Sequence, residues 1–324
     1  MVDEFRPVFV MGCPRSGTTL LTVILDRHSA FAATPETHFF PLSYRRNPSC
    51  TDPEELVRLF CENPGSADCG FDASVLRDAL AVGPANHASL LRAALTSYSK
   101  GLGKRFVVEK TPGHLPFTPL ILGWYPQARC VCIVRDGRDV ALSLKQVEWT
   151  HENVYVHSLR WRYSAALAMK FAEQYAERFH IIRYENLLKD PYDTVSELMD
   201  FLGASFETQQ LAASGTSHVI PERERPWKEK ATRELDRGNL AVWRKVASNR
   251  EFHIMDAVMG DYLRDYGYDD SQTPCWSPFR ACAIGADLLM QLHSPRYFWN
   301  WRIQRRLRQI EKRYGGRSVS PEGT

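Results

Sequence analysis

The stretch VFVMGCPRSGTTLLTVIL, residues 8–25, decides the fold. It begins with a continuous apolar run, passes through a turn of small residues between Gly12 and Gly17, and ends in apolar residues at helical spacing. A strand, a glycine-containing loop and a helix in this order bring several backbone N–H groups together at the positive end of the helix, where they bind phosphate. The stretch therefore predicts an anion site at the end of a buried strand.

The same loop carries part of a motif that binds nucleotide triphosphates. Gly12 and Gly17 have the spacing of G-x-x-x-x-G-K-[ST], but Thr18 stands where that motif has its lysine, and the cation of the loop is Arg15. The spacing keeps a P-loop kinase or NTPase open as an alternative function. The missing lysine counts against it, because that lysine contacts the β- and γ-phosphates.

Three further runs have the composition of buried strands, namely 105–110 (RFVVEK), 128–135 (ARCVCIVR) and 179–184 (FHIIRY). Continuous apolar runs, rather than alternating ones, are typical of strands covered on both faces. Helical patterns separate the runs, at 18–27, 86–98, 156–178 and 192–202. The order predicts an α/β protein with a three-layer, P-loop-like fold, in which a central parallel sheet is flanked by helices and binds its ligand at the carboxyl ends of the strands.

A chain of 324 residues with 44% hydrophobic and 24% charged residues has the composition of an ordinary globular protein. We expect one large domain over residues 1–270, with a helical insertion at about 45–100, and a C-terminal extension over 271–324. Residues 222–237 interleave six basic and five acidic side chains, which indicates either a solvated segment or a lid.

The positive charge of the chain is concentrated in its tail. Residues 296–317 hold eight Lys or Arg and one acid, a local +7 in a chain of formal charge +3, so the remainder is at −4. We therefore expect no nucleic-acid partner for the body of the protein. Residues 295–317 also carry aromatic side chains. They fit either a basic amphipathic helix on an anionic membrane or acidic partner, or a solvated terminal helix docked by its aromatics.

Further features predict a cytoplasmic protein without a metal site. No apolar run approaches the roughly 18 to 20 residues that span a bilayer, and the acidic start MVDEF does not resemble a signal peptide. Peripheral contact with a membrane through the tail stays open. The eight cysteines form no C-x-x-C pair, so buried or free thiols are expected, and Cys130 and Cys132 should share one face of a strand.

A second anion-binding feature lies in VCIVRDGRDVALSL, residues 131–144. A buried strand ends just before Arg135, which follows at the carboxyl edge, and Ser143 lies two turns into the next helix. If this strand neighbours the first one, Arg135 lies beside the first loop. The two features then predict a ligand with phosphates at two separate points. The alternative is that Arg135 pairs with Asp136 or Asp139 and only secures the turn.

Together these motifs resemble the sulfotransferases that use 3′-phosphoadenosine 5′-phosphosulfate (PAPS), in the Golgi-type and bacterial branch that includes tyrosylprotein and heparan sulfotransferases. PRSGTT (14–19) resembles the 5′-phosphosulfate loop of that family, and the Arg-x7-Ser pair Arg135 and Ser143 resembles its 3′-phosphate element. The resemblance extends in order from about residue 6 to residue 268, through PETHFF (35–40), EKTP (109–112) and RYENLLKDP (183–191). It implies a nucleotide-binding transferase of this family.

The resemblance implies in-line transfer of the sulfuryl group from PAPS to a hydroxyl or amine acceptor, with Glu36 as the general base. His38 is the competing base. The alternative for Glu36 is an acid that caps or forms a salt bridge, and the alternative for His38 is simple packing. We expect partial burial to bring the pKa of the base toward neutrality. Lys110 and Arg15 complete the implied catalytic set, because each would stabilise the charge that develops on the bridging oxygen.

The resemblance also implies a set of donor-binding residues: Arg15, Ser16, Gly17, Thr18, Thr19, Arg135, Ser143, Tyr184, Ser217 and Lys228. A sulfuryl group carries one negative charge and its leaving phosphate is already held by the loop, so a metal ion is less necessary than in γ-phosphoryl transfer. The acceptor, whether carbohydrate, lipid, phenol or peptide, is left open. A non-catalytic nucleotide-binding scaffold with the same fold is also left open.

Overall fold

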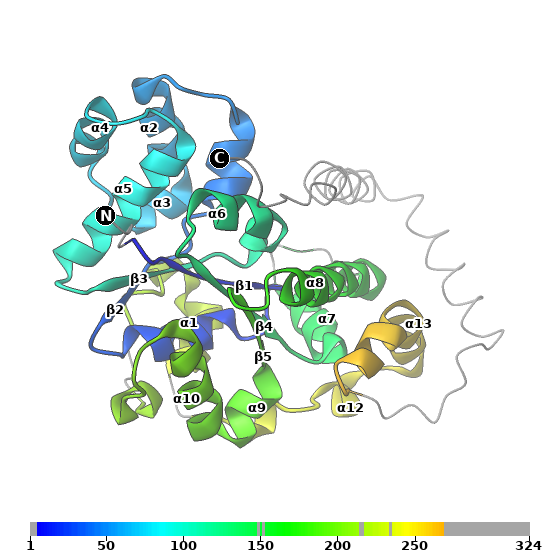
Figure 1. Ribbon diagram of the computed structural model, residues 1–324. Coiled ribbons are helices and arrows are strands. Elements are labelled where there is room, and N and C mark those ends of the chain that lie inside the picture. The colour runs from blue at the N-terminus through cyan, green and yellow to red at the C-terminus, as the bar shows by residue number, and fades with distance from the viewer. Residues whose placement is uncertain (1–4, 148–149, 151–152, 214–216, 233–234, 269–324) are drawn as a thin grey trace.

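The computed structural model describes residues 5–147, 150, 153–213, 217–232 and 235–268. Its middle layer is a sheet of five parallel strands in the order β2-β3-β1-β4-β5, shown in Figure 1. The strands are β1 (Val8–Gly12), β2 (Phe31–Ala33), β3 (Phe106–Lys110), β4 (Arg129–Val134) and β5 (Phe179–Arg183). Because β1 lies between β3 and β4, the carboxyl ends of these three strands meet at one edge of the sheet.

Helices cover both faces of the sheet (Figure 1). One face packs against α1 (Thr18–Asp26), α9 (Tyr184–Lys189) and α10 (Pro191–Leu202), and the other packs against α5 (His87–Gly101), α6 (Thr118–Trp124) and α8 (Val154–Gln174). Side chains alternate along each strand, so β1 contributes to two separate cores. Burial on both sides explains why the strands are apolar throughout.

Three short helices precede α5 in the region where a helical insertion is expected, and its standing as an insertion stays a prediction. They are α2 (Pro53–Cys61), α3 (Pro64–Asp68) and α4 (Ala73–Ala81). Each is preceded by an Asp or Asn whose side chain accepts a hydrogen bond from a backbone N–H of the first turn, which fixes where the helix begins.

The remaining helices surround the edge of the sheet where the strands end. They are α7 (Gly137–Lys145), α11 (Arg225–Lys228), α12 (Trp243–Val246) and α13 (Asn249–Asp265). Single turns complete the chain: η1 (Phe39–Ser43), η2 (Tyr44–Arg46), η3 (Pro112–Phe117), η4 (Thr208–Leu211), η5 (Glu222–Glu224), η6 (Glu229–Thr232) and η7 (Arg237–Asn239). The expected C-terminal extension and its basic segment 295–317 lie outside the described residues, so the domain division stays a prediction.

The predicted fold class is confirmed, and four of the strands lie where the apolar runs indicate. Cys130 and Cys132 share one face of β4, as expected, and both pack in the core on the α5 and α8 side. Strand β2 was missed by the sequence analysis. Its three residues, Phe-Ala-Ala, include no β-branched side chain and are too few to show a period.

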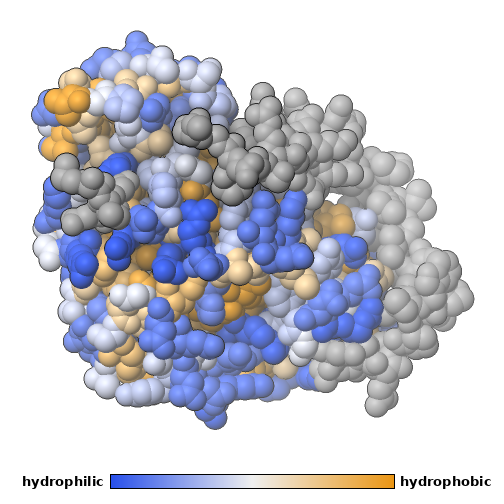
Figure 2. Space-filling view, in the orientation of Figure 1, coloured by the Kyte–Doolittle hydropathy of each residue, from blue (hydrophilic) through white to orange (hydrophobic). Residues whose placement is uncertain are grey.

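The described surface is mostly polar. Figure 2 shows hydrophilic side chains across the middle of the visible face, with hydrophobic ones in smaller patches among them. The large hydrophobic side chains that are exposed come from separate elements: Leu42, Val75, Val82, Leu102, Met169, Tyr192 and Val246. Within the described ranges, no helix combines the length and the apolar character needed to cross a membrane.

Candidate active site

The loop after β1 is shaped by three residues with positive φ. Gly12 has φ 147°, Arg15 has φ 73° and Gly17 has φ 100°. This conformation is uncommon for a residue with a side chain such as Arg15, and strained backbone of this kind persists where the surroundings hold it. A Cβ on Gly17 would lie 2.5 Å from the Tyr184 ring, so the loop needs glycine here for space as well as for its dihedral angles.

The loop presents donors at the start of α1. The first N–H groups of a helix have no partner within it, and Gly17 provides no side-chain cap. Thr18 and Thr19 are the first two residues of this helix. The N–H of Ser16 was expected to belong to this set, but it donates to the Cys13 carbonyl at 3.2 Å. The Ser16 hydroxyl is buried and has no hydrogen-bond partner among the described residues.

We expect Gly17→Ala to destabilise the protein and to weaken nucleotide binding. A left-handed backbone costs an ordinary residue roughly 1–2 kcal/mol, and the added methyl must also displace the Tyr184 ring. The matched control is Gly203→Ala, since Gly203 has φ 73° but open space where its Cβ would lie. Chemical denaturation should show a larger loss of unfolding free energy for Gly17→Ala. Equal losses would mean that Tyr184 does not restrict the loop.

Arg135 lies at the carboxyl end of β4, directly beside β1 in the sheet. Its Nη2 atom donates to the Asn239 carbonyl at 2.7 Å and to Asp139 Oδ2 at 3.2 Å. Its guanidinium lies 4.7 Å from the centre of the Tyr184 ring. The pairing with Asp139 is the alternative that the sequence left open. The Nε atom nevertheless stays buried without a partner among the described residues, so Arg135 retains a donor for a ligand.

The two strand ends meet through Arg15. Its Nε donates to the Ser143 hydroxyl at 3.2 Å, across 128 residues of sequence. Burial lowers the pKa of Arg15, and the nearby Arg135 lowers it further. Two partly buried cations that disfavour each other's charge are stabilised by an anion between them. The structure therefore brings Arg15, Ser143 and Arg135 to one place with the electrostatics of an anion site.

Tyr184 follows β5 and begins α9. Its ring lies against Gly17 on one side and against the Arg135 guanidinium, and its own hydroxyl pKa is raised by burial. The resemblance implies that Tyr184 binds the donor. In the structure its ring contacts both the loop and Arg135, and its contact with the donor stays a prediction.

Glu36 follows β2 and lies beside Lys110, the last residue of β3. Its Oε1 atom accepts hydrogen bonds from Lys110 Nζ at 2.8 Å and from Lys228 Nζ at 2.6 Å. Burial alone would raise the pKa of Glu36, but the two ammonium groups outweigh it and hold that pKa well below its ordinary value. The expected shift toward neutrality is therefore wrong for the ligand-free protein. Burial raises the pKa of a carboxyl group, but the nearby ammonium groups of Lys110 and Lys228 lower the pKa of Glu36 by more.

His38 is the second side chain at this position. Its Nε2 atom is 3.6 Å from Glu36 Oε2, and its side chain is one-third exposed. Burial lowers the pKa of His38, although the carboxylate of Glu36 acts in the opposite direction. The imidazole is therefore neutral near pH 7 and able to accept a proton. Both candidate bases lie side by side, one as a carboxylate and one as a neutral imidazole.

Residues 222–228 reach over this part of the site. Lys228 pairs with Glu36 and Glu224, and Arg223 pairs with Asp68 of the insertion. This location favours the lid over the solvated segment for residues 222–228. The resemblance implies that Lys228 binds the donor, and in the structure its ammonium contacts the candidate base, Glu36.

The structure does not bring Ser217 to the loop. The next residue, His218, pairs with Asp26, the last residue of α1, at the helix end opposite Gly17. A nine-residue helix is about 13 Å long, so this contact lies far from the anion site. A donor-binding role for Ser217 stays a prediction without a supporting contact.

Residues 236–244 supply contacts that the sequence analysis did not assign. Besides the Asn239 carbonyl on Arg135, the Trp243 N–H donates to Asp139 Oδ1 at 2.8 Å. The stretch GNLAVWR (238–244) resembles a late part of the family, but no spacing rule links it to Arg135. Only the tertiary approach of the two segments shows which atoms meet.

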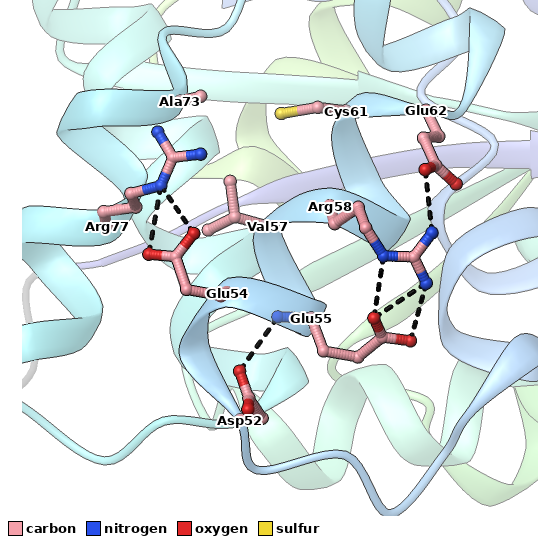
Figure 3. Close-up of a pocket in the computed structure, with 9 residues that line it drawn as sticks. All are labelled: Asp52, Glu54, Glu55, Val57, Arg58, Cys61, Glu62, Ala73 and Arg77. Carbon is pink, nitrogen blue, oxygen red and sulfur yellow. Dashed lines mark hydrogen bonds and ion pairs between the residues drawn. The ribbon is translucent and has the colours of Figure 1, made fainter.

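A separate depression of about 640 Å³ lies between α2 and α4 (Figure 3). The guanidinium of Arg58 points to Glu55 and Glu62, and that of Arg77 points to Glu54. Its cations are thus neutralised by acids on the same surface, and exposed pairs of this kind contribute little to stability. It lacks the unpaired buried donors that mark the loop and Arg135.

These features define a three-layer α/β protein with a glycine-containing loop after β1, which bears Arg15, and a second cation, Arg135, at the neighbouring strand end. The sequence model of the Sulfotransferase family matches residues 7–208, which is more than half of the chain. The protein therefore belongs to the sulfotransferase family. Membership of this family supports sulfuryl transfer as the general chemistry.

Curated relatives are distant. The nodulation protein NoeE of Sinorhizobium fredii is 24% identical over 298 residues, which cover 81% of this chain and 66% of NoeE. Protein-tyrosine sulfotransferase 2 of Gallus gallus is 27% identical over 216 residues, 64% of this chain and 54% of its own. An uncharacterized protein of Aquifex aeolicus is 25% identical over 228 residues, 66% of this chain and 28% of its own. The chain thus spans less than the full length of these relatives.

Among solved structures, the sulfotransferase domain from the Synechococcus PCC 7002 olefin synthase is similar, with a TM-score of 0.58 and 20% identity. The alignment covers 84% of this chain and 98% of that domain. At this identity the likeness shows the fold alone.

Proposed function

We propose that the protein transfers a sulfuryl group from PAPS to a hydroxyl or amine acceptor. The observation that carries the proposal is the contact between Arg15 and Ser143, which joins the loop after β1 to the strand end that bears Arg135. A single doubly phosphorylated nucleotide would then contact both strand ends. The donor, the base and the acceptor class are proposals, since the family supports sulfuryl transfer only in general.

The residues present fit the two phosphates of such a donor. The Ser16 hydroxyl and the Arg135 Nε atom are buried polar groups without partners among the described residues, one at each strand end. Buried polar groups normally have hydrogen-bond partners, so these two atoms indicate a ligand. A guanidinium group matches the geometry of a phosphate, and the buried Nε atom of Arg135 is a donor that such a ligand could take.

The proposed chemistry uses the Glu36 side of the loop. As the acceptor oxygen or nitrogen attacks sulfur, Glu36 takes its proton, and the bond between sulfur and the bridging oxygen of the 5′-phosphate breaks. Lys110 and Arg15 stabilise the negative charge that grows on this oxygen. Lys110 is fully buried and already lies 2.8 Å from Glu36, so an anionic donor would compete with Glu36 for the same ammonium. That competition would free Glu36 to act as a base.

The donor site is tested directly by adenosine 3′,5′-bisphosphate, which keeps both phosphates and lacks the sulfuryl group. We expect it to raise Tm without added metal, because a ligand at about 100 times its Kd adds roughly 2.7 kcal/mol of stability, or about 4 °C for a chain of this length. EDTA should leave the increase unchanged. A shift that requires Mg²⁺ and ATP would instead favour the P-loop NTPase, and no shift at millimolar ligand would contradict the donor site.

The acceptor is proposed only as a class, a hydroxyl or amine on a carbohydrate, lipid, phenol or peptide. Transfer of radiolabelled sulfate from PAPS to panels of these compounds would identify it. Turnover with no acceptor in any panel, together with tight bisphosphate binding, would favour the scaffold alternative. A cytoplasmic location and membrane contact by residues 295–317 stay predictions.

A further inference from the structure

Strand β3 ends in two charged residues, Glu109 and Lys110, and both contact residues of the segment 36–40. Lys110 reaches the side chain of Glu36. The carboxylate of Glu109, on the other face of the strand, is fully buried beneath residues 37–40. A buried carboxylate away from the proposed donor contacts requires an explanation, because burying a charge is costly unless it is fully hydrogen-bonded.

Three side chains donate to Glu109. Thr37 and Thr111 donate their hydroxyls to Oε1, each at 2.7 Å, and His114 Nδ1 lies 2.8 Å from Oε2. A protonated carboxyl would use one oxygen as a donor, whereas the ionised form accepts at both. Burial raises the pKa of Glu109, but His114 and the two hydroxyls lower it below its ordinary value. Glu109 is therefore an anion.

The same three partners hold three consecutive backbone N–H groups. Thr111 Oγ1 accepts from the N–H of His38 at 3.2 Å, and Thr37 Oγ1 accepts from that of Phe39 at 3.2 Å. The N–H of Phe40 points to His114 Nε2 at 3.4 Å. With Nδ1 protonated toward the carboxylate, Nε2 is the acceptor that this contact requires. The contacts of Thr37, Thr111 and His114 are therefore those expected if Glu109 is ionised.

The segment held in this way is strained. His38 has a φ of 48°, in the left-handed region, and such backbone persists only where its surroundings determine it. The charged and titratable groups around Glu36, which immediately precedes the held residues, are Lys110, His38 and Lys228, the last of these paired with Glu224. Glu36 meets them only while this segment keeps its shape.

We infer that Glu109 is a positioning residue, whose buried carboxylate fixes residues 37–40 and thereby holds Glu36 between Lys110 and Lys228. The effect of Glu109 on catalysis rests on the proposed function, in which Glu36 is the base. The effect of Glu109 on the position of Glu36 is independent of that function, and the titration of Glu36 measures it without an acceptor.

The test is Glu109→Gln. Glutamine keeps the size of the side chain, but its amide accepts at only one of the two positions, so either His114 Nδ1–H or the hydroxyls of Thr37 and Thr111 face an N–H₂ donor in place of an acceptor. We expect the segment to loosen and Glu36 to leave the ammonium groups. The pKa of Glu36 should then rise toward its ordinary value. Carboxyl ¹³C NMR of glutamate-labelled protein measures it, with the signal assigned by its absence in Glu36→Gln.

Thr118→Val is the matched control. Thr118 is a fully buried threonine whose hydroxyl donates to the Leu115 carbonyl at 2.8 Å and has no contact with Glu109 among the described residues. It should leave the titration of Glu36 unchanged. Bisphosphate affinity should stay within about threefold in both variants.

Thr111→Val provides a second test, because it removes one link of the network and leaves Glu109 in place. Thr111→Val should raise the pKa of Glu36, as Glu109→Gln does. The variant with both substitutions should raise this pKa by less than the sum of the two single increases, because the two residues belong to one network. If Glu109→Gln does not fold, Thr111→Val still tests whether this network positions Glu36. An unchanged Glu36 titration in Glu109→Gln or Thr111→Val, or a parallel loss of bisphosphate binding, would overturn the inference.

The two proposals fail in different ways. If the native protein binds no bisphosphate and transfers no sulfate, the proposed function is wrong, yet the NMR titration still decides the role of Glu109. If the native protein is active, Glu109→Gln should lower kcat by about tenfold or more while the KM for PAPS stays within about threefold. A fall in kcat without any change in the Glu36 titration would contradict the positioning role.

Discussion

Glu36→Gln should lower kcat by about 10²-fold or more, the usual size of a general-base effect, while the protein keeps its affinity for adenosine 3′,5′-bisphosphate. The reason is that glutamine cannot take the proton of the acceptor. Binding should be retained or become tighter, because Lys110 and Lys228 lose the carboxylate that now pairs with both of them. A loss of kcat with no loss of donor affinity separates a catalytic carboxylate from one that only shapes the site.

Single-turnover transfer from radiolabelled PAPS, with bisphosphate titrations alongside, measures both quantities. Glu62→Gln is the control, since Glu62 is an exposed acid on the surface of the insertion that pairs with Arg58. Full activity in Glu36→Gln would contradict the assignment. His38 would then be the remaining base at this position, and His38→Ala would be the variant to measure.

The second large effect is expected for Arg135→Ala. Hydrogen bonds to charged groups contribute about 1.5–3 kcal/mol, so adenosine 3′,5′-bisphosphate should bind roughly 10- to 150-fold more weakly. Adenosine 5′-monophosphate lacks the 3′-phosphate and should lose much less. The difference between the two nucleotides isolates the contact with that phosphate.

Arg129→Ala is the matched control for this experiment. Arg129 begins the same strand that Arg135 follows, and its guanidinium lies over Phe201 and donates to the Glu177 carbonyl. Isothermal titration with both nucleotides should show little change for this variant. Equal losses of the two nucleotides in Arg135→Ala would assign Arg135 to the turn that it shares with Asp139.

Much of the fold could be predicted because its signals are local. A strand buried on both faces is apolar at every position, and Phe9 to Met11 or Val131 to Ile133 show this within a few residues. The loop after β1 is equally local, since Gly12 and Gly17 are needed at fixed positions by their positive φ. Strand β2 has neither signal and is defined by its pairing with β3.

The candidate site could be predicted only in part, because its charges come from distant segments. Lys228 reaches Glu36 across 192 residues, and its ammonium adds to that of Lys110 in reversing the expected direction of the Glu36 pKa. The stretch EKTP named Glu109 as part of a motif, but only the structure shows that its carboxylate holds the segment that follows Glu36. Pairings of this kind depend on tertiary approach and leave no spacing in the sequence.

The position of β1 between β3 and β4 has a consequence for selectivity. Adjacent strands are about 4.8 Å apart, so the tips that bear Lys110 and Arg135 are separated by roughly 10 Å, with the loop midway. Backbone hydrogen bonds between the strands set this separation, and side-chain substitutions do not alter them. A donor that contacts Lys110 at one strand end and Arg135 at the other, as proposed, must therefore match a distance that the sheet sets, in addition to the contacts that the side chains make.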